Sequence, residues 1–292
     1  MRVHHLNCIS MCPPGGRIFD GTTPFYRPAT LVSHCLVIEA RDSLVLVDTG
    51  LGLDDVRSPS TRLSPLFRAV NRPRLREPLT AVRQIEALGY SPRDVRHIVL
   101  THLDFDHAGG LDDFPFASVH LLDAEEKAAA YRRTPLDRMR YRPKQWSSRP
   151  RWVTYPRSEG EPWLGFECVR RLAGVPPGIL LVPLPGHSAG HSGVAVEADG
   201  GWLLHAGDAY FHRDEIRPGV ARTTPGLRAF QRLVETDHGG RLNTQARLRD
   251  LARDHGEGVE VFCSHDPVEF ERLAGRPARV PAMREREVSR AS

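Results

Sequence analysis

Lysine is almost absent from this 292-residue chain: apart from Lys127 and Lys144, the residues with a permanent positive charge are arginines. These arginines are scattered among acidic residues rather than gathered in a block, and the formal net charge is only +4. A surface that binds nucleic acid needs a basic patch or stripe, so we expect no nucleic-acid partner. A biased codon composition would explain the excess of arginine equally well.

Cysteine is scarce, and long apolar runs are missing. The five cysteines are odd in number and widely spaced, which argues against a disulfide framework and against a CxxC zinc module. No run of about 18 apolar residues is present to cross a membrane. Residues 1–14 also lack an apolar stretch of signal-peptide length. We therefore expect a cytoplasmic protein that has no membrane partner.

Apolar residues recur in a pattern that mixes strands with helices. Strand-like runs lie at 31–40, 44–47, 95–100, 118–122, 179–184, 193–196, 202–205 and 259–263, and helical spacing lies at 78–89, 124–133, 225–236 and 243–254. Strands that alternate with helices in both halves predict an α/β fold, and periodicity alone shows no more than that.

The periodicity disappears between residues 134 and 165. Five prolines interrupt this segment, and three of the four tryptophans lie within it. It is either an aromatic-lined lid over a pocket or a long loop that packs a small core of its own. Because single α/β domains reach this length, we expect one domain over residues 1–292 with 134–165 as an insertion.

Four potential metal ligands lie within six residues in the segment 101–110, directly after an apolar strand. Side chains alternate along an extended backbone, so His102 and Asp104 point to the same side, while Asp106 and His107 turn towards a second position. Two neighbouring metal ions would satisfy all four. The alternative is a polar loop in which Asp106 caps a helix, but capping does not require two histidines and two carboxylates together.

Further potential ligands occur where later strands are predicted to end. His187, Asp208 and His265 each follow shortly after a predicted strand, and His191 lies four residues after His187. Loops at the ends of strands in one sheet can bring their side chains to a single rim. The sequence therefore predicts one site assembled from four loops.

Together these segments resemble the metallo-β-lactamase-fold hydrolase superfamily, whose members carry an HxHxDH motif, a Pro-Gly-His loop, a Gly-Asp turn and a last histidine after a strand. The resemblance covers roughly residues 30–270. It is nearest to the quorum-signal lactonases, because residues 105–110 match the latter part of their motif. It implies a four-layer αββα sandwich and a metal-dependent hydrolase with a dinuclear site.

The resemblance also implies a role for each ligand. His102, Asp104 and His187 would hold the first ion, Asp106, His107 and His265 would hold the second, and Asp208 would bridge both. His191 would support the ligands through a hydrogen bond rather than bind metal itself.

Asp104 departs from the family pattern, in which histidine is commoner at this position. A carboxylate is a hard oxygen donor and adds a negative charge, which shifts preference towards Mn or Fe without excluding Zn. We expect two divalent transition-metal ions, with zinc first among the candidates.

Paired metal ions suit hydrolysis because one ion lowers the pKa of bound water from 15.7 towards about 7, while its partner polarises the substrate oxygen. We expect metal-bound hydroxide to attack an ester, lactone or related carbonyl bond of a small-molecule substrate. Asp106 could also steer a proton to the leaving group. Tyr210 is a candidate to bind a lactone carbonyl, although lactonases place this tyrosine three residues after the bridging carboxylate and here it follows Asp208 by two. The alternative for Tyr210 is a core aromatic.

Three other functions remain open. A phosphodiesterase of the same fold is one, because phosphoester-cleaving branches have similar acidic substitutions. A di-iron redox protein is another, although that branch normally works with a flavin domain. The third is a metal-binding or regulatory protein without catalysis, against which the complete ligand set argues.

Other residues near the motifs carry weaker signals. The segment 48–50, Asp-Thr-Gly, either matches a family turn near the second metal or simply ends a strand. We expect His120, His205 and His212 to be structural or exposed, and the pattern does not predict an oligomeric state.

Overall fold

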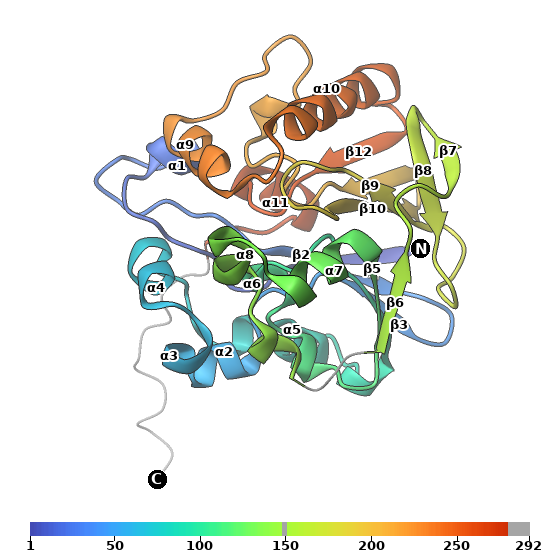
Figure 1. Ribbon diagram of the computed structural model, residues 1–292, viewed down its shortest axis with the longest axis horizontal. Coiled ribbons are helices and arrows are strands. Elements are labelled where there is room, and N and C mark those ends of the chain that lie inside the picture. Colours follow the sequence, from blue (N-terminus) through green and yellow to red (C-terminus); the bar gives the residue numbers. More distant parts are fainter. Residues whose placement is uncertain (148–150, 280–292) are drawn as a thin grey trace.

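Two six-stranded sheets face each other at the centre of the computed structural model, which describes residues 1–147 and 151–279 (Figure 1). The first sheet has the order β1-β2-β3-β4-β5-β6 and the second the order β12-β11-β10-β9-β8-β7. The first consists of β1 (Arg2–Asn7), β2 (His34–Glu39), β3 (Leu44–Val47), β4 (Val95–Val99), β5 (Ser118–Leu122) and β6 (Arg151–Tyr155). The second consists of β7 (Glu161–Trp163), β8 (Phe166–Arg171), β9 (Ile179–Pro183), β10 (Ser192–Ala198), β11 (Gly201–His205) and β12 (Val259–Phe262).

Both sheets are mixed. In the first, β1, β2 and β3 are antiparallel, and β3 to β6 run parallel. In the second, β7 to β11 are antiparallel, and β12 joins β11 in parallel. The tight connection from β2 to β3 is the hairpin that the sequence predicts.

Helices cover the outer faces of the two sheets and surround one rim (Figure 1). The α-helices are α1 (Arg17–Asp20), α2 (Leu53–Arg57), α3 (Pro59–Arg62), α4 (Pro65–Asn71), α5 (Ala81–Ala87), α6 (Phe105–Ala108), α7 (Asp123–Tyr131), α8 (Pro135–Arg140), α9 (Pro225–Val234), α10 (His238–Asp254) and α11 (Pro267–Ala274). The 3-10 helices are η1 (Glu77–Leu79), η2 (Pro92–Asp94), η3 (Leu111–Asp113), η4 (Pro143–Trp146) and η5 (Arg213–Glu215).

The core has separate layers because strand side chains alternate between two faces. In β2, Leu36 faces the space between the sheets, where it belongs to one cluster with Val194 of β10. Its neighbour Val37 faces outwards, in the cluster that contains Ile85 of α5. Leu248 of α10 belongs to the cluster on the outer face of the second sheet. This helix–sheet–sheet–helix order confirms the predicted αββα sandwich.

The rim of the sandwich brings together loops that follow four different strands. Ser192 N–H donates to the Thr101 carbonyl at 2.9 Å, which joins the loop after β4 to the start of β10. Ser264 N–H donates to the Gly207 carbonyl at 3.0 Å, which joins the loops after β11 and β12. All the candidate ligands therefore lie at one edge of the fold.

The segment 134–165 contains α8, η4, β6 and part of the β7–β8 hairpin, and its residues 148–150 lie outside the described part. Residues of α8 line the pocket described below. Trp146 packs edge-on against Trp152 at 6.5 Å between ring centroids, and both contact the cluster on the outer face of the first sheet. The helix thus has the position expected of a lid, while these two tryptophans extend a core. Within the described residues, no helix has the length and apolar character needed to span a bilayer.

Candidate metal centre

The first ligand motif begins where β4 ends and continues into α6. His102 and Asp104 lie on the extended segment before the helix, and Asp106 and His107 lie within it. Asp104 occupies the N-cap position of α6, but its side chain accepts no capping hydrogen bond from a backbone N–H. The alternative in which Asp106 caps a helix is therefore not what the structure shows, because Asp106 is already helical.

One donor set consists of His102, Asp104 and His187, all buried. Asp104 Oδ2 lies 3.1 Å from His187 Nε2 and 3.5 Å from His102 Nε2. A second set consists of Asp106, His107 and His265, in which His265 Nε2 lies 3.8 Å from Asp106 Oδ2. The two sets are the ones that the family resemblance implies for two ions.

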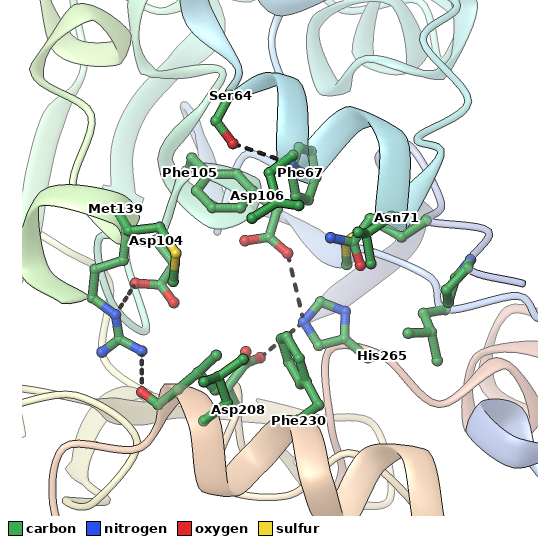
Figure 2. Close-up of a pocket in the computed structure, with 18 of the residues that line it drawn as sticks. Ser64, Phe67, Asn71, Asp104, Phe105, Asp106, Met139, Asp208, Phe230 and His265 are labelled. Atoms are coloured by element: carbon green, nitrogen blue, oxygen red, sulfur yellow. Dashed lines mark hydrogen bonds and ion pairs between the residues drawn. The ribbon is translucent and has the colours of Figure 1, made fainter. Parts of the chain in front are cut away.

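Asp208 lies between the two sets and directs one oxygen towards each. Its Oδ2 is 3.6 Å from His187 Nε2 and 3.8 Å from His102 Nε2. Its Oδ1 is 3.2 Å from His265 Nε2 and 3.3 Å from His107 Nε2. Figure 2 shows the carboxylates of Asp104, Asp106 and Asp208 around one central space.

Several buried polar atoms at this centre have no hydrogen-bond partner among the described residues. They include His102 Nε2, His107 Nε2 and Asp208 Oδ1. Such atoms are costly to bury unless something binds them. Imidazole nitrogens and carboxylate oxygens arranged around a common point are suitable donors for divalent transition metals. The residues present therefore fit two metal ions.

Other groups orient the histidine ligands. Asp48 accepts hydrogen bonds from Thr101 N–H and from His107 Nδ1, each at 2.8 Å. Its φ of 53° is left-handed, which is uncommon for a residue other than glycine. His265 Nδ1 donates to the Val32 carbonyl at 2.6 Å. A partner on Nδ1 leaves Nε2 directed at the metal position, as is usual for metal-binding histidines.

His191 supports Asp208 rather than joining either donor set. Its Nδ1 donates to the Leu184 carbonyl at 2.8 Å, and its Nε2 accepts the Asp208 N–H at 2.8 Å. Gly207 has a φ of 56°, and a Cβ there would lie 2.6 Å from His191 Nε2. The Gly-Asp turn therefore needs its glycine for the close approach of this imidazole.

Glu125, at the start of α7, connects two ligand loops. Its buried carboxylate accepts the Leu103 N–H at 3.0 Å, the Ser188 hydroxyl at 2.7 Å and the Gly190 N–H at 2.9 Å. Sequence reasoning did not identify this role, because an acidic residue in the first turn of a helix is common for dipole reasons alone.

Opposite charges compensate each other at the centre. Burial alone would raise the pKa of the Asp208 carboxyl, but His265 and His107 hold that pKa well below its ordinary value. Burial alone would lower the pKa of His107, but Asp208 and Asp48 raise that pKa well above its ordinary value. Binding of metal ions would replace the protons of such histidines, because ligands must be deprotonated.

Arg140 is a buried cation at the edge of the site, and it comes from α8. Its Nε lies 3.1 Å from Asp104 Oδ1. Burial alone would raise the pKa of Asp104, but Arg140 together with His102 holds that pKa well below its ordinary value. The sequence offered no signal for this contact, because Arg140 lies in the segment without periodicity.

Tyr210 is placed differently from the other candidates. Its hydroxyl donates to the Glu269 carboxylate at 3.0 Å, and its ring belongs to the hydrophobic cluster on the outer face of the second sheet. Tyr210 does not line the pocket. The neighbouring Phe211 lines the pocket instead. Both residues lie in the loop after β11, and their side chains belong to different hydrophobic clusters. The geometry supports the core-aromatic alternative, and we assign Tyr210 no part in the reaction below.

A largely apolar cavity of about 250 Å³ opens above the donor sets (Figure 2). Asp104, Asp106, Asp208, His187 and His265 lie in its lining. Its walls come mainly from α4, α8 and α9, and include Leu63, Phe67, Phe105, Phe211, Phe230 and Val234. A concave apolar pocket with a few convergent polar groups is typical of a small-molecule site.

Comparisons with known proteins agree with this geometry. The family model described as the metallo-beta-lactamase superfamily matches residues 29–265. The chain is 42% identical over 267 residues to a probable metallo-hydrolase of Mycobacterium tuberculosis, which covers 91% of this chain and 81% of that protein. It is also 27% identical over 187 residues to an N-acyl homoserine lactonase of Bacillus cereus. This match covers 64% of this chain and 67% of the lactonase.

Solved structures show the same fold. An N-acyl homoserine lactone hydrolase, with the product N-hexanoyl-L-homoserine at its catalytic metal centre, aligns with a TM-score of 0.67 and 21% identity over 93% of this chain and 95% of that chain. A dizinc quorum-quenching lactonase with a bound product aligns with a TM-score of 0.59 and 15% identity. This alignment covers 90% of this chain and 86% of the lactonase chain.

The chain belongs to the metallo-beta-lactamase superfamily, as its motifs predicted. The 42% identity to a probable metallo-hydrolase confirms the class of enzyme expected from the sequence, a metal-dependent hydrolase.

Proposed function

We propose that the chain is a dinuclear metal-dependent hydrolase that cleaves a carboxylic ester or lactone bearing an apolar acyl group. The observation that carries this proposal is Asp208, which directs one carboxylate oxygen to each of two donor sets at the floor of an apolar pocket. A carboxylate shared between two sites can hold two ions close together, as two-metal hydrolysis needs, and the pocket leaves space for a substrate beside it.

Each residue of the site would have a defined task. The first ion would be held by His102, Asp104 and His187, the second by Asp106, His107 and His265, and Asp208 would bridge them. Zinc is the first candidate for both positions, and Mn or Fe also suits the carboxylate-rich set. When bound, such ions supply Lewis acidity, which activates water at neutral pH and polarises a carbonyl. Asp106 lines the pocket, and its carboxylate would also pass a proton to the leaving group.

The pocket supports an apolar acyl group as the part of the substrate that provides binding energy. Phe67 and Phe230 line it near the metal centre (Figure 2). Leu66 and Leu233 also line it and are 69% and 70% exposed, so apolar surface extends from the ligands to the mouth. Burial of each methylene is worth about 0.8 kcal/mol, or roughly a fourfold change in affinity.

A phosphodiester fits the pocket less well, because the metal ions would have to meet its permanent negative charge without help from an arginine of the lining. Three arginines line the pocket, and their guanidinium groups already contact protein groups. Arg62 Nε donates to Asp55 at 2.8 Å, Arg142 Nε donates to the Arg62 carbonyl at 3.3 Å, and Arg140 Nε faces Asp104. A neutral ester or lactone therefore suits the site better.

The test is a substrate panel with the zinc-loaded protein. It would contain 4-nitrophenyl esters of increasing acyl length, γ-lactones with and without an N-acyl chain, and bis(4-nitrophenyl) phosphate. We expect kcat/KM to rise about threefold to fourfold per methylene until the pocket is filled. Phe230→Ala should reduce this dependence on length, and Phe25→Ala, at a 65% exposed phenylalanine outside the pocket, should not.

Besides failure to cleave any ester or lactone of the panel, two outcomes would refute the proposal. One is faster turnover of the phosphodiester than of any ester or lactone. The other is turnover that survives complete removal of metal by a chelator, which would exclude a metal-dependent reaction.

A further inference from the structure

Arg140 is fixed by contacts to three separate parts of the chain. Besides the contact between its Nε and Asp104 Oδ1, its Nη1 donates to the His187 carbonyl at 3.0 Å. Its Nη2 donates to the Val234 carbonyl at 2.7 Å, at the end of α9. The residue is only 2% exposed, so its guanidinium group has little freedom to reach a substrate. Its role must lie in what it does to its neighbours.

The two oxygens of Asp104 have different surroundings. Oδ2 faces His187 Nε2 and His102 Nε2, which are the other members of its donor set. Oδ1 forms an ion pair with Arg140 Nε at 3.1 Å, although neither atom has a hydrogen-bond partner among the described residues. One oxygen is therefore directed at the first metal position, while the other is paired with the charge of the guanidinium group.

The charges at the centre explain why a cation is buried here. The family pattern with histidine in place of Asp104 would leave two carboxylates, Asp106 and Asp208, to face two dications. This chain has three carboxylates, so the site carries one more negative charge. Arg140 restores the net charge of the commoner ligand set. A metal site with that net charge keeps its capacity to polarise water and a carbonyl.

We propose that Asp104 and Arg140 act as one unit that replaces a neutral histidine ligand. The carboxylate gives a single oxygen to the first ion, and the guanidinium group cancels its extra charge and fixes its orientation. Arg140 is thus a positioning residue of the metal centre. The inference rests on the dinuclear site of the proposed function but not on the substrate.

An interdependence between the two positions follows. Asp104→His alone would restore the commoner ligand but would leave Arg140 as a buried cation without its carboxylate. Arg140 Nη2 lies 3.3 Å from His187 Nε2, so this uncompensated charge would oppose metal binding directly. Changing Arg140 to methionine in the same protein should remove the conflict.

The experiment is a double-mutant cycle on zinc affinity, measured by competition with a chelator of known affinity. The four proteins are the parent, Asp104→His, Arg140→Met and the double variant. We expect Asp104→His to weaken binding of one zinc ion about 10- to 100-fold, the usual effect of disturbing a partner of a metal ligand. The double variant should recover most of this loss. Arg138→Met, at an exposed arginine on the same helix, is the matched control and should change nothing.

Thermal unfolding of the metal-free proteins gives a second readout. Arg140→Met should lower the melting temperature, because it leaves Asp104 as a buried carboxylate without its cation. The double variant should be more stable than Arg140→Met, since it buries neither charge. If Arg140→Met does not fold at all, the comparison of Asp104→His with the double variant still tests the proposal.

The inference is overturned if the double variant binds zinc no better than Asp104→His, or if the two changes have simply additive effects. Turnover distinguishes this failure from failure of the proposed function. A parent protein that binds two ions and shows the expected interdependence, but cleaves no ester or lactone, refutes the hydrolase proposal and leaves the Asp104–Arg140 unit standing.

Discussion

Replacing Asp208 with alanine should cost the protein one metal ion and its hydrolytic activity, while the fold survives. Asp208 is the carboxylate whose two oxygens lie between the donor sets, within 3.2–3.8 Å of four histidine nitrogens. It lies in a loop at the rim of the sandwich rather than in a strand. In the metal-free protein, the histidines that lose this partner can become neutral, so the folded state needs no new counter-charge.

The expected size of the effect follows from electrostatics. Two unit charges 4 Å apart interact by about 4 kcal/mol at an effective dielectric constant of 20. Two dications about 3.5 to 4 Å apart therefore repel by roughly 16 kcal/mol, which the bridging carboxylate offsets in part. Because 1.4 kcal/mol corresponds to a tenfold change in affinity, losing compensation equal to a quarter of that repulsion, about 4 kcal/mol, would weaken the binding of one ion about 1,000-fold. Turnover should fall at least about 100-fold.

The assay combines three measurements on Asp208→Ala and its control. Mass spectrometry measures the metal content after zinc saturation and buffer exchange. Turnover is measured with the best substrate of the panel, and folding is followed by thermal unfolding. Asp42→Ala, at an exposed aspartate in the β2–β3 turn, is the control and should keep both ions and full activity. An Asp208→Ala protein with two ions and near-normal turnover would show that Asp208 is not the bridge.

Three further predictions concern residues around the centre. Asp48→Asn should weaken the binding of one zinc ion about 10- to 100-fold, because His107 loses its charged partner. Unchanged zinc affinity in chelator competition would count against this role of Asp48. Glu125→Gln should lower the free energy of unfolding by about 1 to 3 kcal/mol in urea titrations, because it disturbs three buried hydrogen bonds; no change would mean that the two loops hold each other without it. Burial, helped by His97, lowers the pKa of His120 to about 4, so below pH 6.5 the unfolded chain takes up a proton that the folded chain does not. Stability should therefore fall between pH 6.5 and 4, and this residue should account for about 1 to 2 kcal/mol at pH 5; a His120→Gln protein with the parent's slope of stability against pH would contradict this.

The sequence predicted that the candidate ligands meet at one rim because each follows shortly after a predicted strand, and the family resemblance divided them into two donor sets. Residues at strand ends inherit the alternation and position of the strand, so their side chains can be placed without knowing distant contacts. The same logic recovered β3 and β5 with the observed bounds, Leu44–Val47 and Ser118–Leu122. Apolar strands that pack on both faces leave the strongest pattern in a sequence.

What the sequence missed depends on contacts between distant segments. Strand β1 was not predicted because its sequence, Arg-Val-His-His-Leu-Asn, is largely polar, and pairing with β2 makes it a strand. The position of Asp48 beside His107 was only one of two alternatives, because 59 residues separate the two. Arg140 reaches Asp104 through a helix in the segment without periodicity. No local pattern marks such a partner, and only the folded chain brings the two together.

The single-domain organisation and the identity of the metal stay predictions. The curated relatives and the solved structures bear on the family and the fold, and the donor sets bear on how many ions fit. The preference among zinc, manganese and iron depends on ligand chemistry that Asp104 and Arg140 change together, so it must be measured on the protein itself.

The most direct test of the account is the metal content of the purified parent protein, measured by mass spectrometry after purification in metal-supplemented buffer. The geometry around Asp208 predicts about two transition-metal ions per chain. A protein that holds no ion, or that saturates at one and loses none when Asp208 is replaced, would contradict the dinuclear centre.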